Sequence, residues 1–109
     1  MSVIEPLLRQ DLTRDTLVAR LRAMQPAISR EGVTRMALIG SRARRDNRPD
    51  SDIDLMISVD PSRRFSIFDL IGVKHLVEDE IGLPVDIIME RSLRPDFAAR
   101  AIRDAVEIF

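Results

Sequence analysis

Residues 36–58 read MALIGSRARRDNRPDSDIDLMIS and contain two short apolar runs on either side of a polar segment. The first run, residues 36–39, stops at Gly40 and is typical of a buried strand. Residues 41–45 predict one or two helical turns, and residues 46–51, which include Asn47 and Pro49, predict a loop. From Ile53 onward apolar and polar residues alternate, which predicts a second strand.

Helical patterns flank this segment on both sides. Before it, we expect Thr13 to be the N-cap of a first helix. Pro26 should interrupt that helix, and Gly32 should mark its end. The apolar stripe of that first helix is expected to be Leu17, Leu21, Met24 and Ile28. After the second strand, residues 65–80 predict a long helix that ends at Gly82. Its apolar face is expected to comprise Phe68, Ile71 or Gly72, Leu76 and Val77.

The remainder of the chain predicts one more strand and one more helix. Residues 85–89 predict a third strand, whose single charge is Asp86. Ser92 is the expected N-cap of a last helix that has Pro95 near its start and runs to about residue 104. Residues 105–109 can add an edge strand. The predicted fold class is therefore α/β, a small mixed β-sheet covered by helices.

Composition restricts the kinds of function that the chain can have. A length of 109 residues fits a single domain, residues 1–109, with residues 1–10 as an extended N-terminal segment. There is no cysteine, which excludes disulfides and thiolate zinc sites. No apolar run could span a bilayer and no secretory signal is visible, so we expect a cytoplasmic protein. The net charge of −1 argues against nucleic acid as a direct substrate.

Three aspartates are the candidate catalytic and metal-binding residues. Asp52 and Asp54 are two residues apart on the predicted second strand, so their side chains should share one face. Like charges in that position repel each other, and a divalent cation such as Mg²⁺ would offset the repulsion. If the third strand lies beside the second, Asp86 can join them. Three carboxylates can hold two metal ions about 3.5–4 Å apart, as in phosphoryl transfer.

The segment after the first strand could bind phosphates. Gly40 allows the backbone to approach an anion, and the Ser41 hydroxyl can donate a further hydrogen bond. Arg42 and Arg44 are candidates to pair with phosphate oxygens. The sequence therefore predicts a site for a magnesium-bound nucleoside triphosphate. Asp46 and Asp50, in the loop, are expected to be solvated.

The spacing of these residues resembles a known signature. Gly40-Ser41, ten residues, and then Asp52-Ile53-Asp54 is similar to the pattern of the DNA polymerase beta-like nucleotidyltransferase superfamily, and of its short minimal nucleotidyltransferases in particular. Asp86 stands where the family's third carboxylate is expected, and the resemblance covers the chain from about residue 13 onward. One position departs from the pattern, because Arg45 occupies a place where the family usually has glycine.

The resemblance implies a fold, a reaction and a partner. It implies the nucleotidyltransferase fold, ATP as substrate and two Mg²⁺ ions. Many minimal nucleotidyltransferases are encoded beside a HEPN-domain RNase toxin and act as its antitoxin, by attaching AMP to it or by binding it. The expected function is therefore the transfer of AMP to a hydroxyl of a HEPN-domain partner protein.

Two other functions remain open from the sequence. The chain could be a steric antitoxin with a weak catalytic site, and Arg45 is the residue that keeps this alternative open. It could also transfer nucleotides to a small molecule or to RNA. A chain of 109 residues has little room for a small acceptor unless a homo-oligomer completes the pocket.

Overall fold

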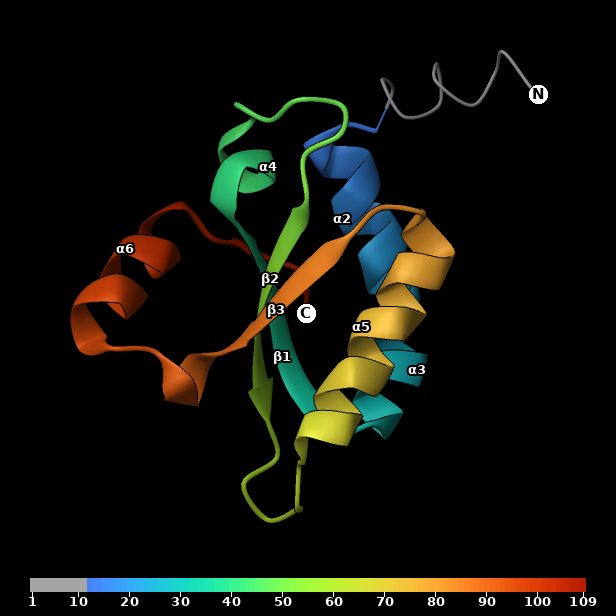
Figure 1. Ribbon diagram of the computed structural model, residues 1–109, viewed down its shortest axis with the longest axis vertical. Helices are drawn as coiled ribbons and strands as arrows, with labels where there is room; N and C mark the ends of the chain where they lie inside the picture. Colours follow the sequence, from blue (N-terminus) through green and yellow to red (C-terminus); the bar gives the residue numbers. More distant parts are fainter. Residues whose placement is uncertain (1–11) are drawn as a thin grey trace.

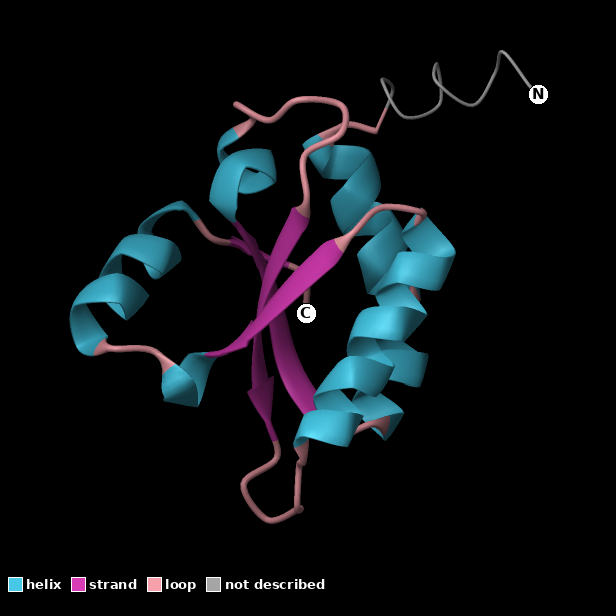
Figure 2. Ribbon diagram, in the orientation of Figure 1, coloured by secondary structure: helices cyan, strands magenta, loops and turns pink. Residues whose placement is uncertain are grey.

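The computed structural model describes residues 12–109, so the expected extended segment at residues 1–10 lies outside the described part. A four-stranded sheet has the order β3-β2-β1-β4 (Figures 1 and 2). The strands are β1 (Val33–Ile39), β2 (Ile53–Val59), β3 (Val85–Met89) and β4 (Val106–Glu107). Strand β1 pairs antiparallel with β2 and β4, whereas β2 and β3 pair in parallel. The predicted small mixed sheet is confirmed.

One face of the sheet is covered by three helices, α2 (Arg14–Ala23), α3 (Gln25–Arg30) and α5 (Ile67–Ile81) (Figure 1). As expected, the Thr13 hydroxyl caps α2 by accepting from the Thr16 amide, and Pro26 marks the start of a separate helix, α3. Helix α4 (Gly40–Arg44) follows β1 directly, and α6 (Pro95–Asp104) lies on the opposite side of the sheet from α5. Within residues 12–109, no helix has both the length and the apolar character needed to cross a membrane.

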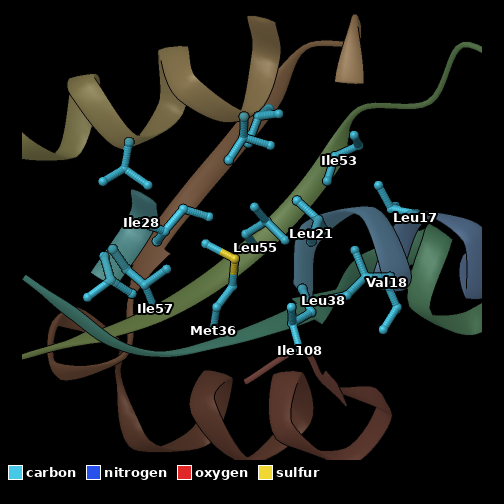
Figure 3. Packing of buried hydrophobic residues seen from close by; sticks show 14 of the residues in the cluster. Leu17, Val18, Leu21, Ile28, Met36, Leu38, Ile53, Leu55, Ile57 and Ile108 are labelled. Carbon is cyan, nitrogen blue, oxygen red and sulfur yellow. The ribbon is translucent and has the colours of Figure 1, made fainter. Parts of the chain in front are cut away.

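The core lies between the sheet and these three helices (Figure 3). Alternation along β2 directs Ile53, Leu55 and Ile57 into it, and all three are almost completely buried. Leu17 and Leu21 of α2 meet them from the helical side, as the spacing of the apolar residues predicted. The other face of β2, which carries Asp54, Met56 and Ser58, is therefore turned toward α6.

Helix α5 is placed correctly by the sequence, but its buried face is not. Ser66 and Asp69 form a capping box at its start, and Gly82 ends it in the left-handed conformation. The residues fully buried against the core are Val73 and Val77. The expectation that Phe68 and Ile71 face the core was wrong, because Phe68 is 80% exposed and Ile71 is 41% exposed.

The start of α6 also differs from the prediction. Ser92 was expected to cap this helix, but it belongs to a short 3-10 turn, η1 (Glu90–Ser92). The N-cap is Arg94, which makes no side-chain capping bond, and Pro95 opens the helix. Proline at the first helical position has no amide to satisfy, so α6 can begin without a serine cap.

Candidate active site

Gly40 brings the backbone directly against a carboxylate. It begins α4 with a φ of 76°, a left-handed conformation that glycine adopts without strain. A Cβ atom built on Gly40 would overlap the Asp54 carboxyl group and lie 3.1 Å from its Cγ atom. Only a glycine therefore lets the β1–α4 junction and Asp54 approach so closely. Ser41 follows in the first turn of α4 and is half-buried.

The three candidate carboxylates come from two neighbouring parallel strands. Asp54 and Asp86 are Cα partners in the pairing of β2 with β3. Asp52 lies one residue before β2 begins, rather than on the strand as expected. Asp54 is half-buried, whereas Asp52 and Asp86 are exposed. The parallel pairing thus places Asp86 beside Asp54. From the sequence, this proximity depended on the assumption that the third strand lies next to the second.

The charges of this group act on one another. Burial raises the pKa of Asp54 above its ordinary value of 3.8, and the like charges of Asp86 and Asp52 raise it further. Arg44 opposes these effects by lowering the pKa of Asp54. The pKa of Asp54 therefore responds to all the charged groups that the sequence assigned to the site, except the buried Arg42.

This raised pKa predicts how the metal-free protein responds to pH. A carboxyl group whose pKa is higher in the folded state makes folding less favourable once it is ionised. We expect Asp54→Asn to raise the free energy of unfolding at pH 7 in chelator, by less than about 1 kcal/mol because the group is only partly buried. The gain should vanish as the pH falls below 3.8, where Asp54 is protonated in both states.

Urea unfolding at both pH values measures this gain. Asp79→Asn, an exposed carboxylate on α5, is the matched control. A gain at pH 7 that the control equals would contradict the interpretation.

The donor set suits a hard cation, although the side chains are not gathered around one. Within residues 12–109, no three His, Cys, Asp or Glu side chains lie close enough together to form a ready-made metal site. The register nevertheless holds Asp54 and Asp86 on adjacent strands, which are about 4.8 Å apart in a sheet. Rotation of these side chains would bring their oxygens together, and carboxylate oxygens are the ligands that Mg²⁺ prefers.

Arg42, expected to contact phosphate, is directed elsewhere. Its side chain is only 2% exposed, and burial lowers its pKa while nearby Asp50 raises it. Its Nε donates to the Ser51 carbonyl at 3.1 Å, and Nη2 donates to the Pro49 carbonyl at 3.0 Å. Through these two hydrogen bonds, Arg42 stabilises the loop that precedes Asp52. Sequence reasoning missed this role, because the burial of Arg42 is set by the fold and no local pattern signals it.

Arg44 is on the surface of α4 and is available to a ligand. Its Nε donates to the Asp46 carboxylate at 3.0 Å, so Asp46 is paired rather than simply solvated. Both side chains are about half exposed, and an exposed pair of this kind contributes little to stability. A phosphate group could therefore compete for Arg44 at small cost.

Arg45 occupies a position that favours glycine. Its φ is 64°, and it is the only residue other than glycine with a positive φ in residues 12–109. A left-handed conformation costs a residue with a Cβ about 1–2 kcal/mol. Arg45, which stands where the family usually has glycine, is thus the residue that ends the short helix α4. The Arg45 side chain forms an ion pair with Asp15, with Nη2 3.5 Å from Oδ1.

We expect Arg45→Gly to stabilise the fold. Relief of the left-handed strain should raise the free energy of unfolding by about 0.5–1 kcal/mol, after the greater backbone entropy of glycine is subtracted. Arg45→Ala, which also loses the ion pair but keeps a Cβ, should give no gain. Thermal or urea unfolding of both variants measures the difference, and an equal gain in the alanine variant would show that strain is not its origin.

Comparison with known proteins agrees with this geometry. A family model described as a nucleotidyltransferase domain matches residues 17–108. A protein of Methanocaldococcus jannaschii, named as a candidate protein adenylyltransferase, is 30% identical over 87 residues, which cover 80% of this chain and 91% of the relative. The solved structure of a protein described as a candidate minimal nucleotidyltransferase superposes with a TM-score of 0.75 at 33% identity, covering 88% of this chain and 96% of that one.

A third comparison concerns the fold alone. The Shewanella oneidensis complex of a tri-AMPylated HEPN toxin with an MNT antitoxin contains a chain that superposes with a TM-score of 0.64 at 10% identity, covering 89% of this chain and 72% of that one. The matched family segment, residues 17–108, contains Gly40, Asp54 and Asp86 together with the whole sheet. The chain therefore belongs to the nucleotidyltransferase domain family.

Proposed function

We propose that this nucleotidyltransferase transfers AMP from ATP to a hydroxyl group of a partner protein, and that the partner is a HEPN-domain toxin which the modification neutralises. The observation that carries the proposal is the contact of Gly40 with Asp54, beside which β3 places Asp86. The backbone to which we assign phosphate binding therefore lies beside these carboxylates, at the ends of adjacent strands. The name of the M. jannaschii relative and the HEPN–MNT complex support the acceptor and the partner.

Each residue has a proposed task in this reaction. Asp52, Asp54 and Asp86 would hold two Mg²⁺ ions, which when bound make an acceptor hydroxyl more acidic and stabilise the leaving pyrophosphate. Gly40 and Ser41 hold the triphosphate, and Arg44 pairs with its oxygens. Arg42 acts through the loop, because it holds the carbonyls that precede Asp52.

The bond changes are those of a nucleotidyl transfer. The acceptor oxygen forms a bond to the α-phosphorus, and the bond from that phosphorus to the β-phosphate oxygen breaks, which releases pyrophosphate. Asp86 lies on the edge strand β3, so an acceptor protein can reach it. Asp86 orients the acceptor hydroxyl and takes its proton, while Asp54 remains beside the phosphate end of the site.

The test is transfer of label from ATP labelled at the α-phosphate, with Mg²⁺ and the protein encoded by the neighbouring gene. We expect label on that protein, and its loss in the double variant Asp52→Asn with Asp54→Asn. Asp79→Asn on the far side of the sheet should retain the transfer. An unlabelled but stable complex would instead indicate a steric antitoxin, and label on an RNA or a small molecule would change the acceptor class.

A further inference from the structure

A cavity of about 330 Å³ lies between the sheet and α6, outside the site described above. Ala37 of β1 and Met56 of β2 line it from the sheet, and Ile102 lines it from α6. Ser58 and Glu90 also line it. Met56 and Asp54 are two residues apart on β2, so their side chains point to the same face of the sheet. The cavity therefore lies on the face that carries Asp54.

The cavity continues the site in a defined direction. Ala37 and Met56 are Cα partners, and two residues further along the strands the partners are Ile39 and Asp54. A strand rises about 3.3 Å per residue, so the cavity begins about 7 Å along the strands from the pair Ile39 and Asp54. A ribose can bridge this separation. The lining residues of the sheet belong to β1, β2 and β4, and Glu90, the residue after β3, lines the cavity as well.

The lining combines apolar walls with a carboxylate. Ala37, Met56 and Ile102 provide apolar surfaces that suit a flat ring. The Ser58 hydroxyl donates to Glu90 Oε2 at 2.6 Å, which fixes the position of this carboxylate. An ionised carboxylate only accepts hydrogen bonds, so it favours an exocyclic amino group and disfavours a carbonyl oxygen. Arg35 and Glu107 also line the cavity, and Arg35 can donate to ring nitrogens.

We propose that this cavity is the nucleobase subsite and binds the adenine ring of ATP between the sheet and α6, with the adenine amino group donating to Glu90. The inference rests on the proposed function, because it requires a triphosphate at Gly40 and Asp54. It adds a basis for nucleotide selection, since guanine would present a carbonyl oxygen to Glu90 where adenine presents a donor. A smaller pyrimidine would leave part of the cavity unfilled.

The first test separates binding of the base from binding of the phosphates. Equilibrium binding of ATP and of inorganic triphosphate is measured in Mg²⁺ for the wild type and for Ala37→Leu, whose side chain would fill the cavity. We expect the variant to bind ATP about tenfold more weakly, whereas its affinity for inorganic triphosphate stays unchanged. Equal ATP affinities in the two proteins would overturn the subsite. A circular dichroism spectrum identical to that of the wild type establishes that the variant is folded.

The second test uses the choice between ATP and GTP. We expect the wild type to prefer ATP, and Glu90→Gln to reduce the ATP-to-GTP affinity ratio by about tenfold, because an amide can donate to the guanine carbonyl. Glu80→Gln, an exposed glutamate on the opposite side of the sheet, is the matched control and should keep the wild-type ratio. A ratio that Glu90→Gln does not change would overturn the assignment of the amino group to Glu90.

These outcomes also separate the subsite from the proposed function. If AMP transfer occurs but both variants keep the ATP affinity and the nucleotide preference of the wild type, only the subsite is overturned. If neither ATP nor inorganic triphosphate binds in Mg²⁺, the proposed function fails and the subsite fails with it.

Discussion

Gly40→Ala is expected to lower the rate of AMP transfer by more than about a hundredfold and to reduce the free energy of unfolding by about 2–3 kcal/mol. The added Cβ would meet the Asp54 carboxyl group, and the residue would also have to adopt a φ of 76°. A left-handed conformation alone costs about 1–2 kcal/mol. The displacement of Asp54 should account for the loss of transfer, measured with α-labelled ATP, and urea unfolding measures the stability.

Two other glycines provide matched controls. Gly82 has a φ of 83° but open space around its Cβ position, so Gly82→Ala should show the cost of the conformation without a loss of transfer. Gly72 lies inside α5 with nothing within 4 Å of its Cβ position, and Gly72→Ala should stabilise the helix by about 0.5–1 kcal/mol. If Gly40→Ala and Gly82→Ala have the same effects, close approach to Asp54 is not important.

Arg42→Met is expected to be the most destabilising change in the segment between β1 and β2, at about 3 kcal/mol. Methionine retains much of the apolar stem of the buried arginine but cannot donate to the carbonyls of Pro49 and Ser51. The loop that enters Asp52 should then be less well fixed, and Mg²⁺ should bind more weakly. Urea unfolding and a Mg²⁺ titration measure the two effects.

Arg44→Met is the surface control for this prediction. Its side chain is 46% exposed and forms a solvent-exposed ion pair with Asp46, so its loss should change stability by less than about 0.5 kcal/mol. Arg42→Lys should fall between the two, because an ammonium group cannot span both carbonyls as the guanidinium fork does. A neutral Arg42→Met would mean that other contacts hold the loop, such as the bond from the Arg48 amide to the Ser51 hydroxyl.

The sequence predicted the elements of this fold because local chemistry determines their ends. Thr13 has a hydroxyl that satisfies a free amide of α2, and Gly82 can adopt the left-handed conformation that ends α5. Alternation of apolar and polar residues placed β2 and identified its buried face. These signals depend only on residues near one another in the chain.

The wrong expectations concerned contacts between distant segments. Phe68 and Val73 are both apolar residues of α5, and only the packing of that helix on the sheet decides that Phe68 faces water and Val73 faces the core. Ser92 carries a capping hydroxyl, but the chain turns once more before α6 begins. Packing on the sheet decides the first outcome, and in the second the helix opens at Pro95 without a serine cap.

The candidate site shows the same division. Alternation led us to expect Asp52 and Asp54 on one face of a strand, but Asp52 lies one residue before β2 begins. The glycine before Ser41 was enough to suggest a close approach of the backbone. Two other features depend on the tertiary fold. One is the parallel pairing that sets Asp86 beside Asp54, and the other is the hydrogen bonding of Arg42 to the loop before Asp52. Whether these residues bind a nucleotide stays a prediction.

The parallel pairing of β2 with β3 also makes the site sensitive to partial opening of the protein. Gly40 directly follows β1 and Asp54 lies on β2, the next strand along the chain, whereas β3, which carries Asp86, joins the sheet only after the chain has passed through α5. An edge strand such as β3 is hydrogen-bonded to a neighbouring strand on one side only, and segments with fewer contacts open at a lower free energy. A molecule that opens at β3 would keep the contact between Gly40 and Asp54 but lose Asp86. With the roles proposed above for these residues, brief local unfolding would interrupt catalysis before it released a bound nucleotide.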